Sequence, residues 1–524
     1  MKLKELIKNL PGSHVIGNAD IPVRGITYDS RQVGRDFIFA AVKGQHLDGR
    51  NFVKDALALG ASAVILEEAL GGLNAVQIVV PDAREAMARV AVAFYGEPCI
   101  NMAIIGVTGT NGKTTITYLV ESILRTAGFN AGVVGTINYR YKDKIFNAPH
   151  TTPEAPDLQR IFREMLDSGV THCVMEVSSH SLAQKRVLGS RIIGGVFTNL
   201  TQDHLDYHKT MEEYFESKSM LFTDFVARER DGFAVINTDD SWGLKLKTQN
   251  SKLKTIGYSL NSEAEIKPAK ASFSEKGIEA SLNTPIGAIN ISSVLLGEYN
   301  LQNIMAAVGV GIGLALDKKT IEKGIAALKR VPGRLERIIS EDGFQAVVDY
   351  AHTGDALERV IGALKPLAKK RLITVFGCGG DRDRGKRPVM GEIAARLSDF
   401  TIITSDNPRT EDPLEIIKEV EAGIKNYPKI LDFKSAPAPR APGNPKSEFI
   451  HGYTAIPDRH EAIMAAVNLA AAGDIILVAG KGHEDYQIIG DRRIPFEDTK
   501  EIKAAMEVRY GSQKPVVSSF YPVS

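Results

Sequence analysis

Cysteine is scarce in this sequence, which contains three cysteines among 524 residues. Cys99, Cys173 and Cys378 lie far apart and form no C-x-x-C motif. Three widely separated cysteines argue against a disulfide framework and against a zinc site of the C-x-x-C kind. We therefore expect three reduced cysteines in the core of a cytoplasmic protein.

An excess of charge of one sign is also absent, since 64 lysine and arginine residues oppose 63 aspartate and glutamate residues. The formal net charge of +1 gives no support for a nucleic acid or a membrane surface as a partner. The sequence lacks an apolar run of about 18 residues, the length that a membrane-spanning helix needs. The N-terminal stretch "MKLKELIKNLPG" has no apolar segment of the signal-peptide kind. We expect a monomer in the cytoplasm, without membrane insertion and without a nucleic acid partner.

The chain is longer than one hydrophobic core usually supports, so several domains are expected. Apolar runs typical of strands alternate with helical patterns almost throughout, which favours an α/β fold with largely parallel sheets. Gly96 and Pro98, and later Pro332 and Gly333, predict boundaries between domains over 1–99, 100–332 and 333–524. A proline-rich stretch at about 426–453 is typical of a surface insertion.

The stretch "AIIGVTGTNGKTT" combines an apolar strand pattern, a glycine-rich turn and the start of a helix. Such a turn lets backbone N–H groups surround phosphate oxygens at the positive end of the helix. Lys113 can reach the terminal phosphates, and the Thr114 hydroxyl can bind Mg²⁺. The stretch departs from the pattern G-x-x-x-x-G-K-[ST], because Val107 stands at the first glycine position. The ATP-binding residues predicted here are Gly106, Thr108, Gly109, Thr110, Asn111, Gly112, Lys113, Thr114 and Thr115.

Three residues further along the chain suit phosphate chemistry. Glu176 ends the apolar run of "THCVMEVSSHSL", where a phosphate-loop enzyme usually carries its acidic Mg²⁺ ligand. His204 follows a strand pattern in "VFTNLTQDHLDYH", and Lys218 lies in the helical pattern "MEEYFESKSMLF". Each also has an ordinary interpretation. Glu176 fits a surface acid, His204 a loop imidazole and Lys218 a solvated helix lysine.

A set of strings occurs in one order along nearly the whole chain: "GVTGTNGKTT", "MEVSSHSLAQKRV", "FTNLTQDHLDYH", "SKSMLF", "GEYNLQN", "VPGRLE" and "DYAHT". Through them the chain resembles the Mur ligases, the ATP-dependent amide ligases that build the stem peptide of peptidoglycan. The resemblance is strongest to the branch that adds the third amino acid. It implies a small N-terminal α/β domain that binds UDP, a central P-loop ATPase domain with a mostly parallel sheet, and a C-terminal Rossmann-like domain.

The resemblance implies catalytic roles for Lys113, Glu176, His204 and Lys218. It places ATP phosphates and Mg²⁺ at Lys113 and Thr114, and the metal sites at Glu176 and His204. Lys218 matches a lysine that carries a carbamate in this family, and a carbamate would turn an ammonium into a carboxylate-like metal ligand. The residues that would complete the nucleotide site are Asn303, at the adenine, Arg334 and Asp349.

The resemblance assigns the first domain to the UDP part of a UDP-N-acetylmuramoyl dipeptide, through "YDSRQV" and "KGQHLDGRNF". Ser30 is expected to contact the uridine, although "DSR" alone also fits a turn with a local ion pair. The residues expected to contact the muramoyl dipeptide are Thr151, Thr152, Ser178, Gln184 and Arg186. A cation such as Arg186 suits a diphosphate and an acidic peptide.

Three apolar runs of the last domain end in polar residues, and ligands of open parallel sheets bind at the carboxyl ends of the strands. meso-2,6-Diaminopimelate differs from lysine by a second carboxylate at its distal end. A guanidinium can bind such a carboxylate through two parallel hydrogen bonds. The motif "DNPR" matches the diaminopimelate-adding branch, with Arg409 at that carboxylate. The residues expected to contact diaminopimelate are Arg382, Asp406, Asn407, Pro408, Arg409, Gly480 and Glu484.

The implied reaction consumes ATP, the UDP-muramoyl dipeptide and diaminopimelate, and passes through an acyl phosphate. Protection of that intermediate from water predicts domain closure about linkers at residues 97–101 and 331–334. A sister ligase, such as one that adds D-Ala-D-Ala or a folylpolyglutamate synthetase, is one alternative, but it should lack "DNPR" together with "GKGHEDYQ". A regulatory protein that binds a nucleotide without catalysis is another alternative. Such a protein would not need all five of Lys113, Thr114, Glu176, His204 and Lys218.

Overall fold

The structure is a computed structural model that describes residues 1–44, 47–430 and 451–511. The chain forms two compact units. Unit 1 comprises Met1–Ala269, Ser281–Asn290 and Gln302–Ala327, and unit 2 comprises Lys270–Ala280, Ile291–Leu301 and the chain from Leu328 onward. Residues 45–46 of the predicted UDP signature and residues 431–450 of the proline-rich stretch lie outside the described residues.

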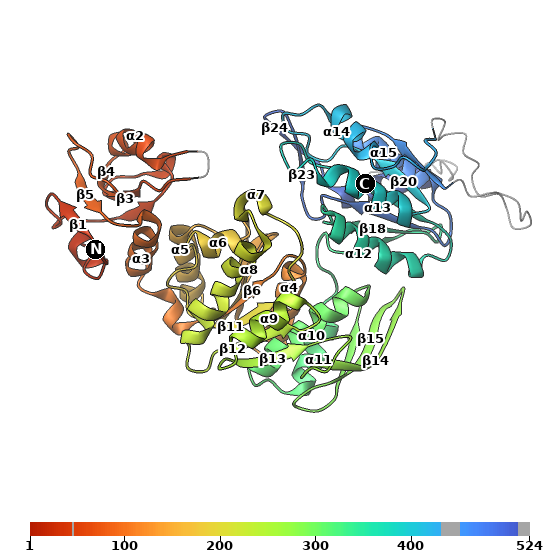
Figure 1. The fold of residues 1–524 in the computed structure, drawn as a ribbon, viewed down its shortest axis with the longest axis horizontal. Coiled ribbons are helices and arrows are strands. Elements are labelled where there is room, and N and C mark those ends of the chain that lie inside the picture. The colour runs from red at the N-terminus through yellow and green to blue at the C-terminus, as the bar shows by residue number, and fades with distance from the viewer. Residues whose placement is uncertain (45–46, 431–450, 512–524) are drawn as a thin grey trace, which may run out of the picture. The chain divides into compact units, whose positions relative to one another are not determined.

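The first sheet of unit 1 has the strand order β1-β5-β4-β3-β2 and is parallel except for β1 (Figure 1). Its strands are β1 (His14–Ile16), β2 (Gly25–Thr27), β3 (Phe37–Ala40), β4 (Ala61–Leu66) and β5 (Val76–Val79). The helices of this region are α1 (Leu3–Leu6), α2 (Val53–Ala58) and α3 (Ala83–Phe94). Ile38 and Ile65 belong to one hydrophobic core, and Phe39 and Val64 belong to a second. Because both faces of the sheet are buried, β3 and β4 are continuous apolar runs.

The second sheet of unit 1 has the order β13-β12-β11-β6-β10-β7-β8-β9. It is parallel from β13 to β7, and β8 and β9 extend it as antiparallel strands. Its strands are β6 (Ala103–Thr108), β7 (Ala131–Val134), β8 (Asn138–Tyr141), β9 (Lys144–Asn147), β10 (His172–Glu176), β11 (Ile192–Phe197), β12 (Phe233–Asn237) and β13 (Lys254–Tyr258). The associated helices are α4 (Lys113–Thr126), α5 (Ala155–Asp167), α6 (Ser179–Ala183), α7 (Leu205–His208), α8 (Met211–Met220), α9 (Ser241–Gln249) and α11 (Lys318–Ala327). The carboxyl ends of the central strands β6, β10 and β11 therefore share one edge of this sheet.

A small sheet with the order β14-β15-β16 and the long helix α10 contain residues of both compact units. Their bounds are β14 (Lys267–Ser274), β15 (Gly277–Asn283), β16 (Ile289–Ser293) and α10 (Glu298–Gly313).

Unit 2 is built on a sheet with the order β17-β18-β22-β19-β20-β21, in which only the pairing of β17 with β18 is antiparallel. Its strands are β17 (Glu336–Ile339), β18 (Gln345–Asp349), β19 (Leu372–Phe376), β20 (Phe400–Ile403), β21 (Gly452–Ala455) and β22 (Ile475–Ala479), and a hairpin follows with β23 (Tyr486–Ile489) and β24 (Arg492–Pro495). The helices are α12 (Gly354–Leu364), α13 (Lys386–Leu397), α14 (Pro413–Glu421), α15 (Arg459–Leu469) and α16 (Asp498–Gly511). One core joins the sheet to α12, α13 and α14, and a second joins it to α15 and α16.

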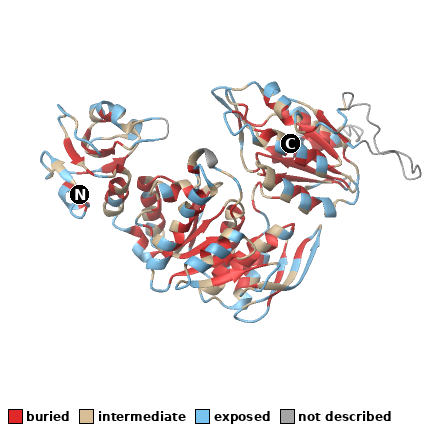
Figure 2. Ribbon diagram, viewed as in Figure 1, coloured by how far each residue is buried: buried red, intermediate tan, exposed pale blue. Residues whose placement is uncertain are grey.

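Buried residues lie along the strands of the large sheets, as Figure 2 shows. The predicted α/β fold with mostly parallel sheets is therefore confirmed. The predicted burial of Cys99, Cys173 and Cys378 is confirmed as well, and all three are free thiols. The domain boundaries near residues 99 and 332 stay predictions.

Candidate active site

The predicted phosphate loop links the end of β6 to the start of α4. Gly109 has a φ of 140°, and a Cβ atom at this position would lie 1.8 Å from the hydroxyl oxygen of Thr198. Gly112 has a φ of 89°, and a Cβ atom there would lie 2.4 Å from Oδ1 of Asn303. Both positions need glycine, because a side chain would meet a backbone strain and a steric clash together. The loop is thus packed closely between the segment after β11 and helix α10.

Gly106 lies outside this turn, contrary to the prediction. It pairs with Met175 of β10 and with Gly195 of β11 in the middle of the sheet. A Cβ atom at residue 106 would lie 3.0 Å from a methyl carbon of Leu221. Gly106 thus packs closely beneath the sheet within a central strand, not in the turn, and its expected phosphate contact stays a prediction.

Lys113 and Asn199 hold the loop together in this structure. The Lys113 ammonium donates to the carbonyl oxygens of Gly109 at 2.9 Å and Thr110 at 2.8 Å. The N–H of Thr110 donates to the carbonyl oxygen of Asn199 at 2.8 Å, and the N–H of Asn111 donates to its Oδ1 at 3.0 Å. Asn199 lies in the string "VFTNLTQDHLDYH", but the sequence alone assigns it no role. Its contacts show that it supports the phosphate loop.

Glu176 lies at the end of β10, buried beside the first turn of α4. The Thr114 hydroxyl donates to Glu176 Oε1 at 3.0 Å, and Thr136 donates to the carboxylate through its N–H and its hydroxyl, both at 2.9 Å. A surface acid is therefore excluded. A fixed carboxylate next to a hydroxyl is a donor pair that suits Mg²⁺, which commonly takes its other ligands from water and substrate phosphates. Across the ranges that the structure describes, no group of three or more His, Cys, Asp or Glu side chains is arranged for a metal ion.

Lys218 is buried in α8, with a side-chain exposure of 1%. Its Nζ donates to the carbonyl oxygen of Gly109 at 2.9 Å and lies 4.5 Å from the centre of the Tyr214 ring. Burial, together with the nearby Lys113 ammonium, lowers the pKa of Lys218 well below its usual value. The interpretation as a solvated helix lysine is therefore wrong. Since Lys113 donates to the same carbonyl oxygen, the site favours an uncharged amine at Lys218.

His204 approaches the phosphate loop through aromatic neighbours. Its Nε2 lies 3.5 Å from Asp203 Oδ2, and its ring centre lies 5.0 Å from that of His180 and 6.1 Å from that of Tyr214. The Tyr214 hydroxyl lies 3.3 Å from Oγ1 of Thr110 in the loop. His204 has a φ of 54°, and such strained backbone is often found at functional sites.

The residues predicted to contact the muramoyl dipeptide adjoin Glu176. The Thr152 hydroxyl donates to the carbonyl oxygen of Glu176 at 2.8 Å and accepts from the N–H of Ser178 at 3.2 Å. The Thr151 hydroxyl lies 3.0 Å from that of Thr136, which also binds Glu176. Thr152 is buried, so its hydroxyl is already committed within the protein. Thr151 lies at the edge of the same cluster.

Arg186 supplies a fixed cation to this cluster. It donates to Oε1 of Gln184 at 2.7 Å and to the carbonyl oxygen of Thr152 at 3.0 Å, and it pairs with Glu154 at 3.1 Å. Burial, with a contribution from Arg186, lowers the pKa of His150. The structure therefore brings together Thr151, Thr152, Ser178, Gln184 and Arg186, as predicted.

Ser30 begins a short 3₁₀ turn after Asp29. The Asp29 carboxylate accepts from Nε of Arg31 at 2.9 Å and from its Nη2 at 2.8 Å. The turn with a local ion pair is thus present. The contact of Ser30 with the uridine stays a prediction.

Arg334 and Asp349, predicted at the nucleotide, lie together in unit 2. Asp349 ends β18 and accepts from the N–H groups of Leu335 and Ala351, both at 2.8 Å. Burial raises the pKa of Asp349, while the Arg334 guanidinium opposes that rise. Arg334 lies over the ring of Tyr350, with Cζ 4.7 Å from its centre. The remaining predicted nucleotide residue, Asn303, belongs to unit 1 and adjoins Gly112.

The polar residues predicted at diaminopimelate follow β19, β20 and β22, which are parallel neighbours in the sheet. The Asn407 amide donates to Oε2 of Glu484 at 2.9 Å, which joins the loop after β20 to the loop after β22. Gly480 has a φ of 114°, and its N–H donates to the carbonyl oxygen of Asp349 at 3.1 Å. The strand-end residues are therefore gathered at one edge, as predicted.

Lys481 is a member of this cluster that the sequence did not identify. It is fully buried, and its Nζ lies 3.0 Å from Glu484 Oε2, 3.3 Å from Asn407 Oδ1 and 3.6 Å from Asp406 Oδ1. One buried ammonium thus lies within 3.6 Å of two carboxylates. The string "GKGHEDYQ" contains Lys481, but lysine is usually solvated, so the sequence alone gave no reason to select it.

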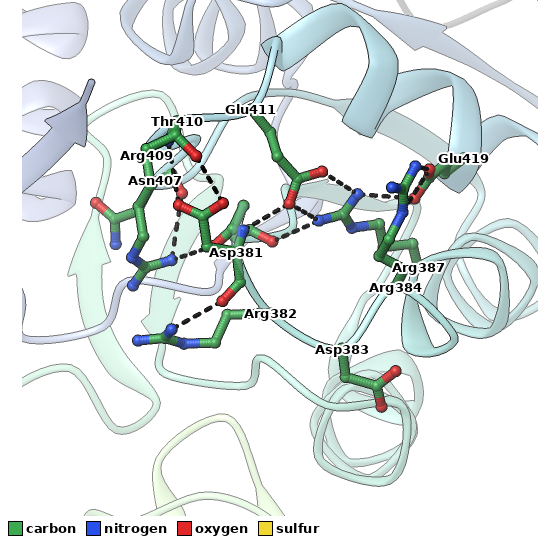
Figure 3. A network of polar contacts seen from close by, with 12 residues as sticks. Asp381, Arg382, Asp383, Arg384, Arg387, Asn407, Arg409, Thr410, Glu411 and Glu419 are labelled. Atoms are coloured by element: carbon green, nitrogen blue, oxygen red, sulfur yellow. Dashed lines mark hydrogen bonds and ion pairs between the residues drawn. The ribbon is translucent and has the colours of Figure 1, made fainter. Parts of the chain in front are cut away.

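Arg409 is fixed at its backbone and at its side chain, and Figure 3 shows the side chain. Its φ is 52°, its N–H donates to the carbonyl oxygen of Ile488 at 3.1 Å, and its own carbonyl oxygen accepts from Gly490 at 2.7 Å. Its Nη1 donates to the carbonyl oxygens of Gly380 at 2.7 Å and Asn407 at 3.4 Å. Burial, with the nearby Arg382, lowers the pKa of Arg409 from its high usual value, and the guanidinium stays charged at neutral pH.

Arg382 and Pro408 flank Arg409. Arg382 is exposed, and its Nη1 donates to the carbonyl oxygen of Asp381 at 2.9 Å. The carbonyl oxygen of Pro408 would lie 1.9 Å from a Cβ atom at Gly380, so the loops after β19 and β20 meet backbone to backbone.

For the described residues, none of the helices combines the length and apolar character that crossing a membrane would take.

Comparison with known proteins relates this chain to one family of ligases. Three family models match: the Mur ligase family, catalytic domain, over residues 22–95; the Mur ligase middle domain over residues 107–311; and the Mur ligase, glutamate ligase domain over residues 333–482. The UDP-N-acetylmuramoyl-L-alanyl-D-glutamate–2,6-diaminopimelate ligase of Geobacter sulfurreducens is 48% identical, over 96% of this chain and 98% of that protein. The ligase of the same name from Gloeobacter violaceus is 43% identical, over 97% of this chain and 99% of that protein.

Solved structures extend the relationship to the fold. A structure of a UDP-N-acetylmuramoyl-L-alanyl-D-glutamate–2,6-diaminopimelate ligase matches with a TM-score of 0.67 and 35% identity, over 97% of this chain and 99% of that one. MurF ligase from Thermotoga maritima in complex with ADP matches with a TM-score of 0.61 and 17% identity, over 94% of this chain and 99% of that one. The second likeness concerns the fold alone.

Proposed function

Because the chain belongs to the Mur ligase family, we propose that it is an ATP-dependent ligase of peptidoglycan synthesis. It joins meso-2,6-diaminopimelate to the D-glutamate of UDP-N-acetylmuramoyl-L-alanyl-D-glutamate. The observation that carries this proposal is the cluster of Asp406, Asn407, Arg409 and Glu484 at the carboxyl ends of adjacent parallel strands. This cluster offers a guanidinium and carboxylates together, as an amino acid with two charged ends requires.

ATP binding is proposed at the loop between β6 and α4. Lys113 holds loop carbonyl oxygens in this structure, and the same ammonium would bind phosphate oxygens once a nucleotide occupies the site. Asn303, next to Gly112, would lie near the adenine, and Arg334 with Asp349 would complete the nucleotide site. Asn303 adjoins Gly112 in unit 1, and Arg334 lies near Asp349 in unit 2, which supports these roles.

Thr114 and Glu176 are the groups proposed to hold Mg²⁺, and His204 and Lys218 are proposed to complete the metal sites. A bound Mg²⁺ would supply positive charge that offsets the repulsion between the D-glutamate carboxylate and the phosphates of ATP. The low pKa of the buried Lys218 supports a further proposal, that its neutral amine reacts with CO₂. The amine nitrogen forms a bond to the CO₂ carbon and releases one proton, which leaves a carbamate.

In the proposed first step, a γ-carboxylate oxygen of D-glutamate forms a bond to the γ-phosphorus of ATP, and the bond from that phosphorus to ADP breaks. The Lys113 ammonium and the helix N-terminus stabilise the charge that develops on the transferred group. In the second step, the amine of diaminopimelate bonds to the acyl carbon, loses a proton, and expels phosphate. Arg186, fixed by its hydrogen bond to the Thr152 carbonyl oxygen, would orient the UDP-muramoyl dipeptide, and Ser30 would contact its uridine.

Diaminopimelate is proposed to bind with its second carboxylate at Arg409. The described hydrogen bonds of the Arg409 side chain use Nη1, which leaves the other edge of the fork directed to a ligand. Asp406 and Glu484 would accept the distal ammonium, with Arg382, Pro408 and Gly480 at the same edge. We further propose that the enzyme acts as a monomer in the cytoplasm.

Phosphate release measured with meso-diaminopimelate and with L-lysine tests the proposed function. We expect release that requires ATP, the UDP-muramoyl dipeptide and an amino acid together, with a strong preference for diaminopimelate. In Arg409→Ala this preference should collapse, because loss of a buried guanidinium–carboxylate pair removes about 2–5 kcal/mol of binding free energy. The matched control is Arg396→Ala, which removes an exposed arginine of α13 that pairs with Glu358 and Glu392. A wild-type enzyme that prefers lysine, or that hydrolyses ATP without the other substrates, would contradict the proposal.

A further inference from the structure

The loops after β19 and β20 are packed against each other without side chains between them. We call residues 377–385 the first loop and residues 404–412 the second loop. A Cβ atom at Gly377 would lie 2.3 Å from the carbonyl oxygen of Thr404, and one at Gly380 would lie 1.9 Å from that of Pro408. The N–H of Gly380 donates to the carbonyl oxygen of Asn407 at 2.9 Å. Any shift of one loop is therefore transmitted directly to the other.

Arg387 lies directly behind these loops, near the start of α13, and it is fully buried. Its Nη1 and Nη2 donate to the two carboxylate oxygens of Glu411 in the second loop, both at 2.8 Å. Nη2 also donates to the carbonyl oxygen of Gly379 in the first loop at 3.1 Å, and Nη1 donates to Glu419 of α14 at 2.7 Å. One planar guanidinium thus ties together both loops and the helix that follows the second loop (Figure 3).

Further hydrogen bonds connect Glu411 and Thr410 to Asp381, which lies next to the predicted substrate residue Arg382. Glu411 Oε1 also accepts from the N–H of Asp381. The Asp381 carboxylate accepts from the hydroxyl of Thr410 at 2.8 Å and from its N–H at 3.2 Å. Asp381 precedes Arg382, and Thr410 follows Arg409, so these bonds fix the backbone on which both arginines stand. Asp381 and Arg409 each have a positive φ, of 52°, which surrounding contacts must maintain.

We propose that Arg387 is a positioning residue that sets the spacing between Arg382 and Arg409, and thereby the recognition of an amino acid with a second carboxylate. This inference rests on the proposed function, because it concerns how the same site selects diaminopimelate over lysine. Arg387 acts through Glu411 and Gly379. Its guanidinium is buried behind the loops, with four hydrogen bonds to groups of the protein.

The proposal is tested with Glu411→Gln, which keeps the size of the side chain and removes its charge, and with Arg387→Lys, which keeps the charge and loses the fork. Steady-state phosphate release gives KM and kcat for diaminopimelate, lysine, ATP and the UDP-muramoyl dipeptide. We expect KM for diaminopimelate to rise by up to about 100-fold, because a displacement of about 1 Å in a positioned group has effects of that size. KM for ATP and for the dipeptide should stay within about 2-fold, because the described bonds of Arg387 reach no residue proposed at those substrates. The preference over lysine should fall.

Arg384→Gln is the matched control, because Arg384 is exposed and its described side-chain hydrogen bonds go to Glu419 alone, not to Glu411 or Gly379. It should leave all KM values unchanged. The proposal is overturned if the Arg387 and Glu411 variants raise every KM together with a loss of thermal stability, or if they leave KM for diaminopimelate unchanged. If Arg387→Lys fails to fold, Glu411→Gln decides, since Glu411 is partly exposed at the surface. Wild-type enzyme without diaminopimelate-dependent activity would instead reject the proposed function.

Discussion

Lys218 shows how burial changes what a residue can do. An amine that is 1% exposed and shares a carbonyl oxygen with Lys113 is disfavoured as a cation. Its neutral form can react with CO₂, whereas a solvated lysine at neutral pH is almost wholly protonated. The residue therefore links the local packing of α8 to the chemistry proposed at the phosphate loop.

We predict that phosphate release falls in buffer depleted of CO₂ and returns when bicarbonate is added. Lys218→Met should lower kcat by at least about 100-fold, the size expected for loss of a charge-stabilising group, and bicarbonate should not restore it. Thermal unfolding of Lys218→Met serves as the control, and it should show a folded protein, because Met fills the buried site without a charge. Activity in wild type that is insensitive to prolonged CO₂ depletion would contradict the carbamate.

For single residues, the sequence indicates candidate functional groups but not how deeply each side chain is buried. Lys113, Thr114 and Glu176 could be predicted because their spacing from a strand end specifies them. Neither Lys481 nor Arg387 was predicted as a site residue, although Lys481 lies in the string "GKGHEDYQ". Their importance comes from burial, and lysine or arginine at a strand end is indistinguishable in sequence from a solvated one.

The elements themselves followed from the sequence, since alternating strand and helix patterns predicted the parallel sheets. The register that brings Phe376 beside Ile403 and Ala479 was not predictable, because pairing between distant strands depends on the whole core. Gly106 was misplaced for a related reason. A glycine at the end of a strand pattern can serve the turn or the packing of the strand, and only the packing of Leu221 decides between them.

The connection between α13 and the loop after β20 gives a pH-dependent prediction. Arg387 holds the pKa of Glu411 at about 2, from a usual value of 4.5. A carboxyl group whose pKa is lower in the folded state stabilises the fold above its unfolded pKa, and this contribution is lost as the pH falls through the folded pKa. The free energy of unfolding of wild type should therefore exceed that of Glu411→Gln by about 1–2 kcal/mol at neutral pH.

That difference should shrink between about pH 4.5 and pH 2, measured by urea denaturation of both proteins at a series of pH values. The comparison removes the effect of other carboxylates, which titrate in both proteins alike. A difference that is constant down to pH 2 would show that Arg387 does not hold Glu411 in its charged form.

At the scale of the whole molecule, the predicted hinge at residues 331–334 is anchored at its far end. Gly333 has a φ of 63°, and a Cβ atom there would lie 2.1 Å from the backbone nitrogen of His483. Gly482 in turn would bring a Cβ atom within 2.8 Å of the Gly333 carbonyl oxygen. The end of the linker therefore belongs to the same rigid part as the turn that carries Gly480 and Glu484. Any closure about this linker must pivot on residues before Gly333.

We predict that Gly333→Ala lowers kcat at least tenfold and destabilises the protein by about 1–3 kcal/mol, because alanine is strained at this φ and meets the His483 backbone. Small-angle scattering should show that ATP with the UDP-muramoyl dipeptide reduces the radius of gyration of wild type and has less effect on the variant. Gly362→Ala is the matched control, since no atom lies within 4 Å of a Cβ placed at that helical residue. Equal compaction of wild type and Gly333→Ala would show that the anchor has no part in closure.

The buried cysteines have a practical consequence for observing such movements. Burial raises the pKa of Cys99 and of Cys378 to about 12, and that of Cys173 as well. Maleimide reagents attack thiolates that solvent can reach, so the native protein offers them almost no target. A pair of fluorophores could therefore be attached at two engineered surface cysteines, one in each compact unit, with the three native cysteines left in place.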